Sequence, residues 1–524
     1  MVAMLALVLA VISLAYCYSH HLLLLFGDAV AHLHIARRVL DSRRPGFRQL
    51  GTVWLPLPHV LLVPFAANMA WWRSGLAGAG SSVACYVAAA TGIYRLARFW
   101  FTPIVSLLPF AAFALNPGLL YFATTAMTEP LFLAAMIWSV VFVIAFLLRA
   151  KAAKWAAAVR ALTGLTVALI AAIYTRYDGW VLAFLAWLFV LPACVRARHV
   201  REVKRAFVWM TAVLAIAPTA WLVYNYYLTG DALDFLRGPY SARAIDARTT
   251  PPGAAHYAGF HSLRVAEIYF LKAAKLGVGT GTTGDWILRF AVAGLLVGAW
   301  VYRKNSFAPL MLLMLPLPFY AYSIAYGSVP LFVPVWWPFS WYNTRYGMEL
   351  LPALALFPVF LLALIPPRLT SWRNATAVVA LALIAFNSYC VARATPLVLQ
   401  EARRNSTTRI PFERALSQTL TYLPPHATLL MYTSHFVGAL QRAGIPLKQT
   451  LNEGDFREWQ AALRDPAGNA DYVLAIDGDA VANAVAAHPQ GLEETSVICS
   501  TGQPCARLYV SPARAARFNL YTGR

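Results

Sequence analysis

Long apolar runs recur through most of the first 394 residues and decide which class of protein this chain can form. A transmembrane helix needs about 20 apolar residues, because the hydrocarbon core of a bilayer is about 30 Å thick. Hydrophobic residues occupy 60% of the 524 positions and charged residues 12%, whereas soluble proteins average about 25% charged residues. The sequence therefore predicts a polytopic α-helical membrane protein.

The apolar runs predict about eleven transmembrane helices. Their approximate ranges are 3–25, 77–98, 102–122, 130–149, 161–175, 180–195, 206–228, 285–301, 306–326, 348–365 and 374–394. The first run lacks a basic region before it and a small-residue cleavage site after it, so we expect a retained helix and not a signal peptide. The net charge of +21 does not indicate nucleic acid, because Lys and Arg flank membrane spans.

The loop charges predict the orientation. Basic residues gather in five loops that fall on one side of the membrane: Arg95 and Arg98; Arg149, Lys151, Lys154 and Arg160; Arg196, Arg198, Arg201, Lys204 and Arg205; Arg303 and Lys304; Arg368 and Arg373. The positive-inside rule makes that side cytoplasmic. We therefore expect a multi-pass protein of the cell inner (plasma) membrane, with a cytoplasmic N-terminus and residues 395–524 outside the cytoplasm.

Residues 55–72 are apolar but contain Pro56, Pro58 and Pro64. Proline interrupts a helix by removing a donor and by clashing with the preceding turn. We therefore expect a helix that lies in the outer leaflet, which leaves a first outer loop at 27–76. The alternative is a true span with a different pairing of spans elsewhere.

A polar stretch, residues 27–59, stands out in this otherwise lipid-soluble part of the chain. If Asp28 starts a helix, then Asp28 and His32 share one face of it. The remaining polar residues include Arg37, Arg38, Arg43, Arg44, Arg48 and His59. The stretch is either an active-site loop that handles an anionic lipid or an amphipathic helix on phospholipid headgroups.

Other polar residues collect on the same predicted outer side. They are Glu129 within Thr128-Glu129-Pro130, Arg176-Tyr177-Asp178, a loop at 229–284, and an aromatic loop at 328–345 that contains Tyr342. The aromatic residues suit an interfacial belt, and aromatic faces also stack on sugar rings and polyprenyl chains.

From residue 395 the composition becomes that of a small soluble α/β domain. Expected strands lie at 428–432, 472–476, 495–499 and 506–510, and expected helices at 436–443, 456–463 and 480–487. Asp477-Gly478-Asp479 is typical of a tight turn. Cys499 and Cys505 lie close together in this polar region, and we expect them to form a disulfide in an oxidising compartment.

Several short patterns resemble the GT-C glycosyltransferases. They are an acidic residue after the first span (Asp28), a second one in Thr128-Glu129-Pro130, and Arg345-Tyr346 ahead of Pro352-Ala353-Leu354. Over 1–200 and 340–365 the chain is most similar to the protein O-mannosyltransferase and aminoarabinose-transferase branch. Members move a sugar from a polyprenyl-phosphate carrier to an acceptor outside the cytoplasm. The resemblance implies catalytic roles for Asp28 and Glu129, and it places Arg345 at the carrier phosphate.

The chain departs from the family pattern at two places. Ala29 stands where many relatives have a second acid beside the first. Trp336-Trp337-Pro338-Phe339 replaces the Trp-Trp-Asp-Tyr-Gly sequence of oligosaccharyltransferases. This difference argues against transfer of a whole glycan to asparagine.

Sugar transfer from a phosphate-linked lipid needs a base for the acceptor hydroxyl and a cation for the leaving phosphate. An intramembrane or interfacial carboxylate is costly unless it is paired or functional, so Asp28 is a candidate base. Glu129 is either its partner or an acid that stabilises a helix N-terminus. For Arg176, an ion pair with Asp178 is the favoured interpretation. The candidate substrate-binding residues are His32, Arg37, Arg38, His59, Arg176, Asp178, Tyr342, Arg345 and Tyr346.

His32 and His34, with Asp28 and Glu129, have the ligand types of a zinc or manganese site. Only His32 lies on the expected helical face, so we predict neither a metal nor another cofactor. The expected partners are a polyprenyl-phosphate-sugar donor, the bilayer, and a glycan, lipid or protein acceptor, without nucleic acid. A transporter or flippase and a non-catalytic scaffold are the alternative functions.

Overall fold

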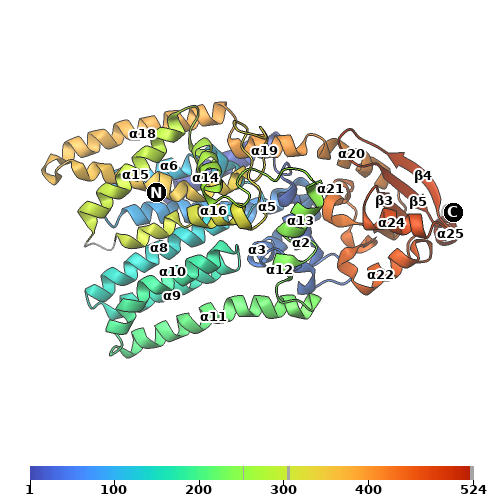
Figure 1. Ribbon diagram of the computed structural model, residues 1–524, viewed down its shortest axis with the longest axis horizontal. Helices are drawn as coiled ribbons and strands as arrows, with labels where there is room; N and C mark the ends of the chain where they lie inside the picture. The colour runs from blue at the N-terminus through green and yellow to red at the C-terminus, as the bar shows by residue number, and fades with distance from the viewer. Residues whose placement is uncertain (252, 304–306, 520–524) are drawn as a thin grey trace. The chain divides into compact units, whose positions relative to one another are not determined.

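The computed structural model describes residues 1–251, 253–303 and 307–519, and Figure 1 labels its elements. Within these residues, ten helical segments are long and apolar enough to cross a membrane. They are Val2–Ser19, Leu76–Ala97, Glu129–Lys151, Trp155–Ile173, Asp178–Arg196, Arg201–Thr229, Thr283–Tyr302, Ala308–Tyr326, Thr344–Leu364 and Thr370–Ser406. A polytopic helical membrane protein is thereby confirmed. Lys304, one of the basic residues used for orientation, lies outside the described residues.

The apolar run at 102–122 is divided into α6 (Pro103–Ala114) and α7 (Pro117–Phe122). The break falls at Asn116, because a residue before proline disfavours the helical conformation. The Asn116 side chain accepts a hydrogen bond from the Leu119 N–H and so caps α7.

The proline-containing run at 55–72 likewise forms two short helices, α3 (Leu57–Ala66) and α4 (Met69–Ser74). A helix of ten residues is about 15 Å long, or about half of a bilayer core.

The chain divides into two compact units. The helical unit consists of Met1–His20, Thr52–Pro58 and Ser81–Glu401, and the sheet unit consists of His21–Gly51, His59–Gly80 and Ala402–Arg524. Segments of the predicted first outer loop therefore pack with the C-terminal part of the chain.

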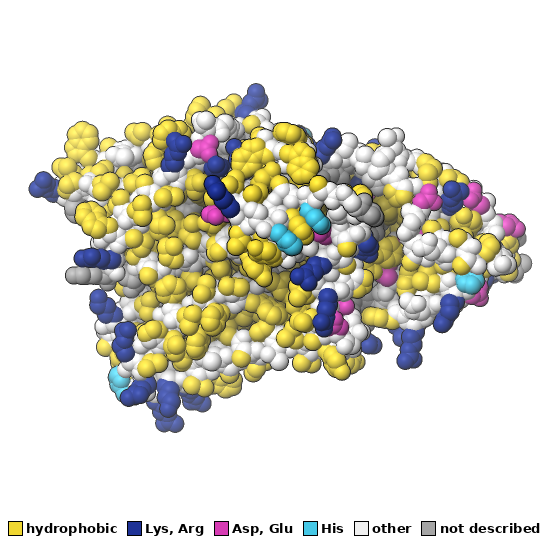
Figure 2. Space-filling model, viewed as in Figure 1, with side chains coloured by type: hydrophobic (Ala, Val, Ile, Leu, Met, Phe, Trp, Pro, Cys, Tyr) yellow, Lys and Arg dark blue, Asp and Glu magenta, His cyan; other side chains and the backbone are white. Residues whose placement is uncertain are grey.

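In the helical unit, α8 (Glu129–Lys151) occupies the interior, packed on α9 (Trp155–Ile173) and α10 (Asp178–Arg196). Of the residues in its span, 72% are buried, whereas 11% are buried in the span that contains α18 (Thr370–Arg393). Figure 2 shows hydrophobic side chains over most of the visible flank of the helices. Lys and Arg gather along the edge that carries the α8–α9 and α10–α11 loops, as the loop charges predict.

The other helices of this unit complete the bundle and its connections. They are α1 (Val2–Ser19), α5 (Leu76–Ala97), α11 (Arg201–Thr229), α12 (Asp234–Arg237), α13 (Ala242–Thr249), α14 (Leu263–Val278), α15 (Thr283–Tyr302), η2 (Ala308–Met314), α16 (Pro316–Tyr326), η3 (Thr344–Leu350), α17 (Leu351–Leu356), η4 (Phe357–Leu364), η5 (Pro367–Leu369) and α19 (Leu397–Ser406).

The sheet unit contains a five-stranded sheet in the order β2-β1-β3-β5-β4. The strands are β1 (Leu429–Met431), β2 (Thr450–Leu451), β3 (Tyr472–Ile476), β4 (Glu493–Ile498) and β5 (Ala506–Val510). β1 is parallel to β2 and β3, whereas β5 is antiparallel to β3 and β4. The four predicted strands are confirmed, and the two-residue β2 is too short to carry a sequence pattern.

An apolar core that includes Leu430, Trp459 and Val473 joins the sheet to α22 and α24. The sheet unit contains these two helices and several others. They are α2 (Gly27–Arg38), η1 (Phe47–Leu50), α20 (Arg409–Leu420), α21 (Thr433–Ala443), η6 (Leu447–Gln449), η7 (Glu453–Asp455), α22 (Arg457–Arg464), α23 (Pro466–Asn469), α24 (Ala480–Ala487) and α25 (Pro512–Asn519). The predicted Cys499–Cys505 disulfide is confirmed.

Candidate functional site

Five ionisable side chains meet inside the helical unit and form what we term the acid–arginine cluster. Its members are Glu129, Arg176, Asp178, Arg345 and Glu349. The Arg176 guanidinium lies 3.1 Å from Glu349, 3.6 Å from Asp178 and 3.8 Å from Glu129. Arg345 Nε lies 3.4 Å from Glu129 Oε1. All three carboxylates are buried, so the cluster is an ionic centre in an apolar bundle.

Local sequence explains how two of these carboxylates reach the cluster. Glu129 and Asp178 are the first residues of α8 and α10, where the helix dipole stabilises an acid. The turn between α9 and α10 is tight at Gly179, where a Cβ atom would lie 2.2 Å from the Ala172 carbonyl oxygen. This turn brings Arg176 close to Asp178 and confirms the predicted ion pair.

Tyr320 joins the cluster through its hydroxyl, which donates to Glu349 Oε1 at 2.7 Å and accepts a hydrogen bond from Arg176 Nη2. The Tyr346 ring stacks on Tyr320, with 4.6 Å between the centroids. The guanidinium groups of Arg176 and Arg345 lie 5.4 and 5.2 Å from the centroid of that same ring. The Tyr346 ring therefore contacts both cations of the cluster.

Arg176 stays charged in this setting. Burial alone lowers the pKa of a guanidinium, but Glu349, Tyr320, Asp178 and Glu129 together raise the pKa of Arg176 well above its ordinary value. Three carboxylates within 4 Å neutralise this arginine.

The structure brings together five of the predicted site residues: Glu129, Arg176, Asp178, Arg345 and Tyr346. Sequence reasoning missed Glu349 and Tyr320. Glu349 carried a usable signal, because a carboxylate inside an apolar span is costly and marks a site or a pair. A tyrosine in an apolar helix is common, so Tyr320 carried none.

Tyr342 lies in the loop before η3 and forms an isolated antiparallel bridge with Phe332. The Phe332 N–H donates to the Tyr342 carbonyl at 3.0 Å, and the two ring centroids are 5.9 Å apart. The Tyr342 side chain is 40% exposed, so its ring is accessible for stacking.

The remaining predicted residues belong to the sheet unit. Asp28 lies in the first turn of α2, which confirms that it starts a helix. His32 follows one turn later and is buried against His59, with 2.8 Å between His32 Nδ1 and His59 Nε2. His34 lies on another face of α2, 3.3 Å from the Thr433 hydroxyl. Burial, with a contribution from Arg38, holds the pKa of His34 well below its usual value.

The arginines of this stretch hold the loop together. Arg37 lies 2.8 Å from Asp41 and donates to the carbonyls of Ala66 and Ala67. Arg38 donates to the Gln49 carbonyl at 2.7 Å. The Arg44 side chain pairs with Glu458 at 2.7 Å, and Arg43 pairs with the same carboxylate. Among the described residues, no three His, Cys, Asp or Glu side chains are arranged to hold a metal ion.

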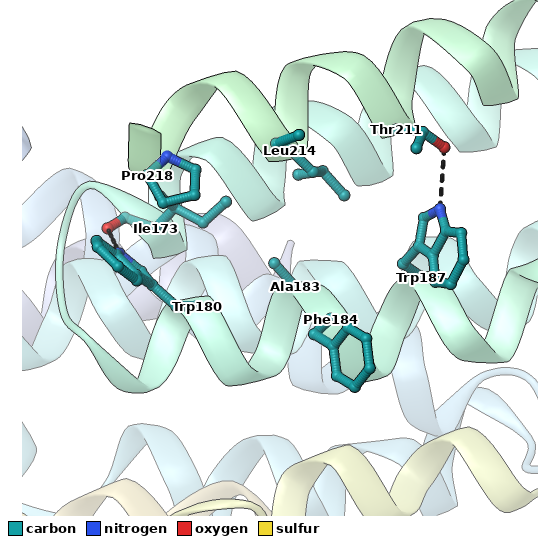
Figure 3. A pocket seen from close by; sticks show the side chains of 9 residues that line it. Ile173, Trp180, Ala183, Phe184, Trp187, Thr211, Leu214 and Pro218 are labelled. Atoms are coloured by element: carbon teal, nitrogen blue, oxygen red, sulfur yellow. Dashed lines mark hydrogen bonds between the residues drawn. The ribbon is translucent and has the colours of Figure 1, made fainter. Parts of the chain in front are cut away.

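An apolar pocket of about 430 Å³ lies between α10 and α11 in the helical unit (Figure 3). Its lining residues are Ile173, Trp180, Ala183, Phe184, Trp187, Thr211, Leu214, Ala215 and Pro218. The Thr211 hydroxyl donates to the Phe207 carbonyl and accepts from Trp187 Nε1, at 2.9 Å each. With its polar groups satisfied in this way, the pocket suits a hydrocarbon chain and not a sugar.

No family model matches the sequence, and no curated protein matches it either. Among solved structures, the chain is similar to ArnT from Cupriavidus metallidurans bound to undecaprenyl phosphate. That match covers 97% of both chains, with a TM-score of 0.58 and 12% identity. The two proteins share a fold. The predicted fold, a polytopic helical protein with a small C-terminal α/β domain, is therefore confirmed.

An oligosaccharyltransferase from Archaeoglobus fulgidus, AglB, in complex with an inhibitory peptide and a dolichol-phosphate also matches. The match covers 91% of this chain and 69% of that chain, with a TM-score of 0.44 and 12% identity.

Proposed function

We propose that this protein is an integral-membrane glycosyltransferase that moves a sugar from a polyprenyl-phosphate-linked donor to an acceptor outside the cytoplasm. The buried acid–arginine cluster is the observation that carries the proposal. A bundle of apolar helices tolerates three buried carboxylates and two partly buried arginines only where these groups pair or serve a substrate. The fold shared with ArnT, whose structure is bound to undecaprenyl phosphate, supports the same substrate class.

Arg345 is the proposed phosphate ligand. Its guanidinium lies 3.4 Å from Glu129, and both groups are held at helix starts. A guanidinium matches the geometry of phosphate oxygens and stabilises the charge that the leaving phosphate acquires. Glu129 holds Arg345 in place, and Arg176 is assigned to structure and not to substrate, since its charge is neutralised by three carboxylates.

Asp28 is the proposed general base. It accepts the proton of the acceptor hydroxyl while the acceptor oxygen forms a bond to the anomeric carbon of the sugar. The bond from that carbon to the phosphate oxygen breaks, and the polyprenyl phosphate leaves with the electron pair. His32, one turn along α2 and in contact with His59, keeps this end of the helix ordered.

Other predicted residues have supporting roles in this proposal. Tyr342 is the proposed stacking surface for the sugar. Arg37 and Arg38 shape the loop around Asp28, since their guanidinium groups bind Asp41 and backbone carbonyls. The apolar pocket between α10 and α11 has the chemistry to hold a hydrocarbon chain. Residues 395–524 are proposed to lie outside the cytoplasm.

The test is transfer of a radiolabelled sugar by the purified protein in nanodiscs. The donor is a labelled polyprenyl-phosphate sugar, and peptides, glycans and lipids are offered as acceptors in parallel. We expect label to leave the donor only when a competent acceptor is present, with release of free polyprenyl phosphate. In proteoliposomes, a transporter or flippase would instead move the intact labelled donor across the bilayer without breaking the sugar–phosphate bond.

A further inference from the structure

Glu401 is a buried carboxylate far along the chain from the other residues of the site. It lies in α19, is 1% exposed and belongs to the helical unit. Its Oε1 accepts a hydrogen bond from the Asn343 N–H at 2.8 Å. Its Oε2 accepts from the Thr344 N–H at 2.9 Å and from the Thr344 hydroxyl at 2.5 Å. The two carboxylate oxygens thus accept hydrogen bonds from two consecutive residues.

Those two residues begin η3, the element that carries Arg345. Asn343 is the N-cap of η3 and has a φ of 55°, a left-handed conformation that Asn tolerates better than most residues. Its side chain donates to the Pro330 carbonyl at 2.9 Å. The N–H groups at a helix start lack partners within the helix, so a carboxylate there satisfies them and interacts favourably with the helix dipole.

Arg345 follows immediately after the two residues that Glu401 holds. Its side chain lies 3.4 Å from Glu129 and within electrostatic range of the Glu401 carboxylate. Glu401 therefore holds the backbone next to Arg345, while Glu129 pairs with the Arg345 guanidinium.

We infer that Glu401 is a positioning residue that sets the affinity for the polyprenyl-phosphate donor by fixing the backbone beneath Arg345. The inference rests on the proposed function. It predicts an effect on the donor and not on the acceptor, and it predicts that the effect disappears when Arg345 is absent.

The test compares Glu401→Gln and Glu401→Asp in the intact protein with and without Arg345→Ala. Glutamine keeps the size of the side chain but offers one acceptor oxygen to a site with three donors. Because small misplacements of a binding group cost up to about 100-fold in rate, we expect Glu401→Gln to lower kcat/KM for the donor by roughly 10- to 100-fold. The acceptor KM should stay unchanged, and Glu401→Asp, which retains the carboxylate, should lose less.

In the Arg345→Ala background, Glu401→Gln should cause no further loss, because residues that act through one another are not additive. The matched control is Gln400→Ala. Gln400 accepts a hydrogen bond from Trp341 Nε1, in the loop before η3, whereas the two N–H groups at the start of η3 donate to Glu401. This control should retain the donor kinetics of the wild type.

Two further measurements separate the role of Glu401 from a loss of transfer activity and from a loss of folding. Titration of undecaprenyl phosphate against each variant in nanodiscs repeats the comparison without turnover. If the wild type transfers no sugar, this binding measurement still tests the role of Glu401. If Glu401→Gln is not monodisperse, Thr344→Val removes one of the three hydrogen bonds and should shift donor binding in the same direction. Equal losses with and without Arg345, or an unchanged donor affinity in a folded Glu401→Gln protein, would overturn the inference.

Discussion

Arg176 and Glu349 form a buried ion pair, with 3.1 Å between Nη2 of the arginine and Oε1 of the glutamate. The pair joins the turn between α9 and α10 to η3, two parts of the chain that are far apart in sequence. Tyr320 bridges the same two groups through its hydroxyl. This contact therefore links the helices that surround the candidate site.

Replacement of Arg176 by methionine should destabilise the protein strongly. The change keeps an unbranched side chain but removes the guanidinium, which leaves Glu349, Asp178 and Glu129 without their shared cation. Removal of one partner from a buried ion pair costs about 3–5 kcal/mol. Thermal unfolding in detergent, followed by loss of the monodisperse peak, measures the effect. The exposed Arg160→Met is the matched control and should melt like the wild type, whereas equal melting of both variants would contradict the structural role of Arg176.

Asp28→Asn should abolish most of the turnover and leave binding of undecaprenyl phosphate nearly intact. Asparagine keeps the shape of the side chain but cannot accept the proton, and a general base contributes roughly 10²–10⁴-fold in rate. Arg345→Ala should instead weaken binding, because it leaves a phosphate charge uncompensated. The exposed Glu493→Gln serves as control. Near wild-type turnover by a folded Asp28→Asn protein would remove Asp28 as the base and make Glu129 the candidate to test.

A reporter enzyme that works only outside the cytoplasm should be active when it is fused after Thr395. The positive-inside rule, applied to the basic loops, predicts this orientation. A periplasmic reporter such as alkaline phosphatase should therefore give a signal, and a cytoplasmic reporter at the same position should not. The reverse pattern would show that the number of spans before this point differs by one.

The sheet unit should lose stability as the pH rises from about 4 to about 6. Burial raises the pKa of Asp455 to about 6, from an ordinary value of 3.8. Within this window the unfolded chain has already released the proton that the folded state still holds, so the free energy of unfolding falls with increasing pH. Hydrogen exchange of the β1 and β3 amides measures this fall. Asp455→Asn should flatten the slope, and the turn variant Asp477→Asn should keep it.

Reduction of the Cys499–Cys505 disulfide should have a small effect. The bridge closes a loop between residues only six positions apart, so the chain-entropy model gives about 2 kcal/mol at most. Non-reduced peptide mapping should show the two cysteines linked, and Cys499→Ser with Cys505→Ser should lower the free energy of unfolding of the sheet unit by no more than that amount. Two free thiols in the native protein would contradict the bridge.

Patterns that depend on local sequence were predictable. The apolar runs predicted the membrane class, and alternation with turn residues predicted β3, β5 and α24 at their observed positions. Asp28 at the start of α2 and Asp178 at the start of α10 were also predictable, since an acid is favoured at a helix N-terminus. Such features need only neighbours in the chain.

The partners of the buried charges could not be predicted in this way. Arg176 pairs with Glu349, Tyr320 contacts both, and Glu401 holds Asn343 and Thr344. These contacts join residues that are 29 to 173 positions apart, and no local pattern encodes them. The grouping of the first loop with the C-terminal residues in one compact unit was likewise decided by the tertiary structure. The positions of apolar segments and helix starts can be read from the sequence, because both follow from hydrophobicity and local hydrogen bonding. Which charged groups meet can be read only from the packed fold, because a buried ion pair depends on how distant helices pack.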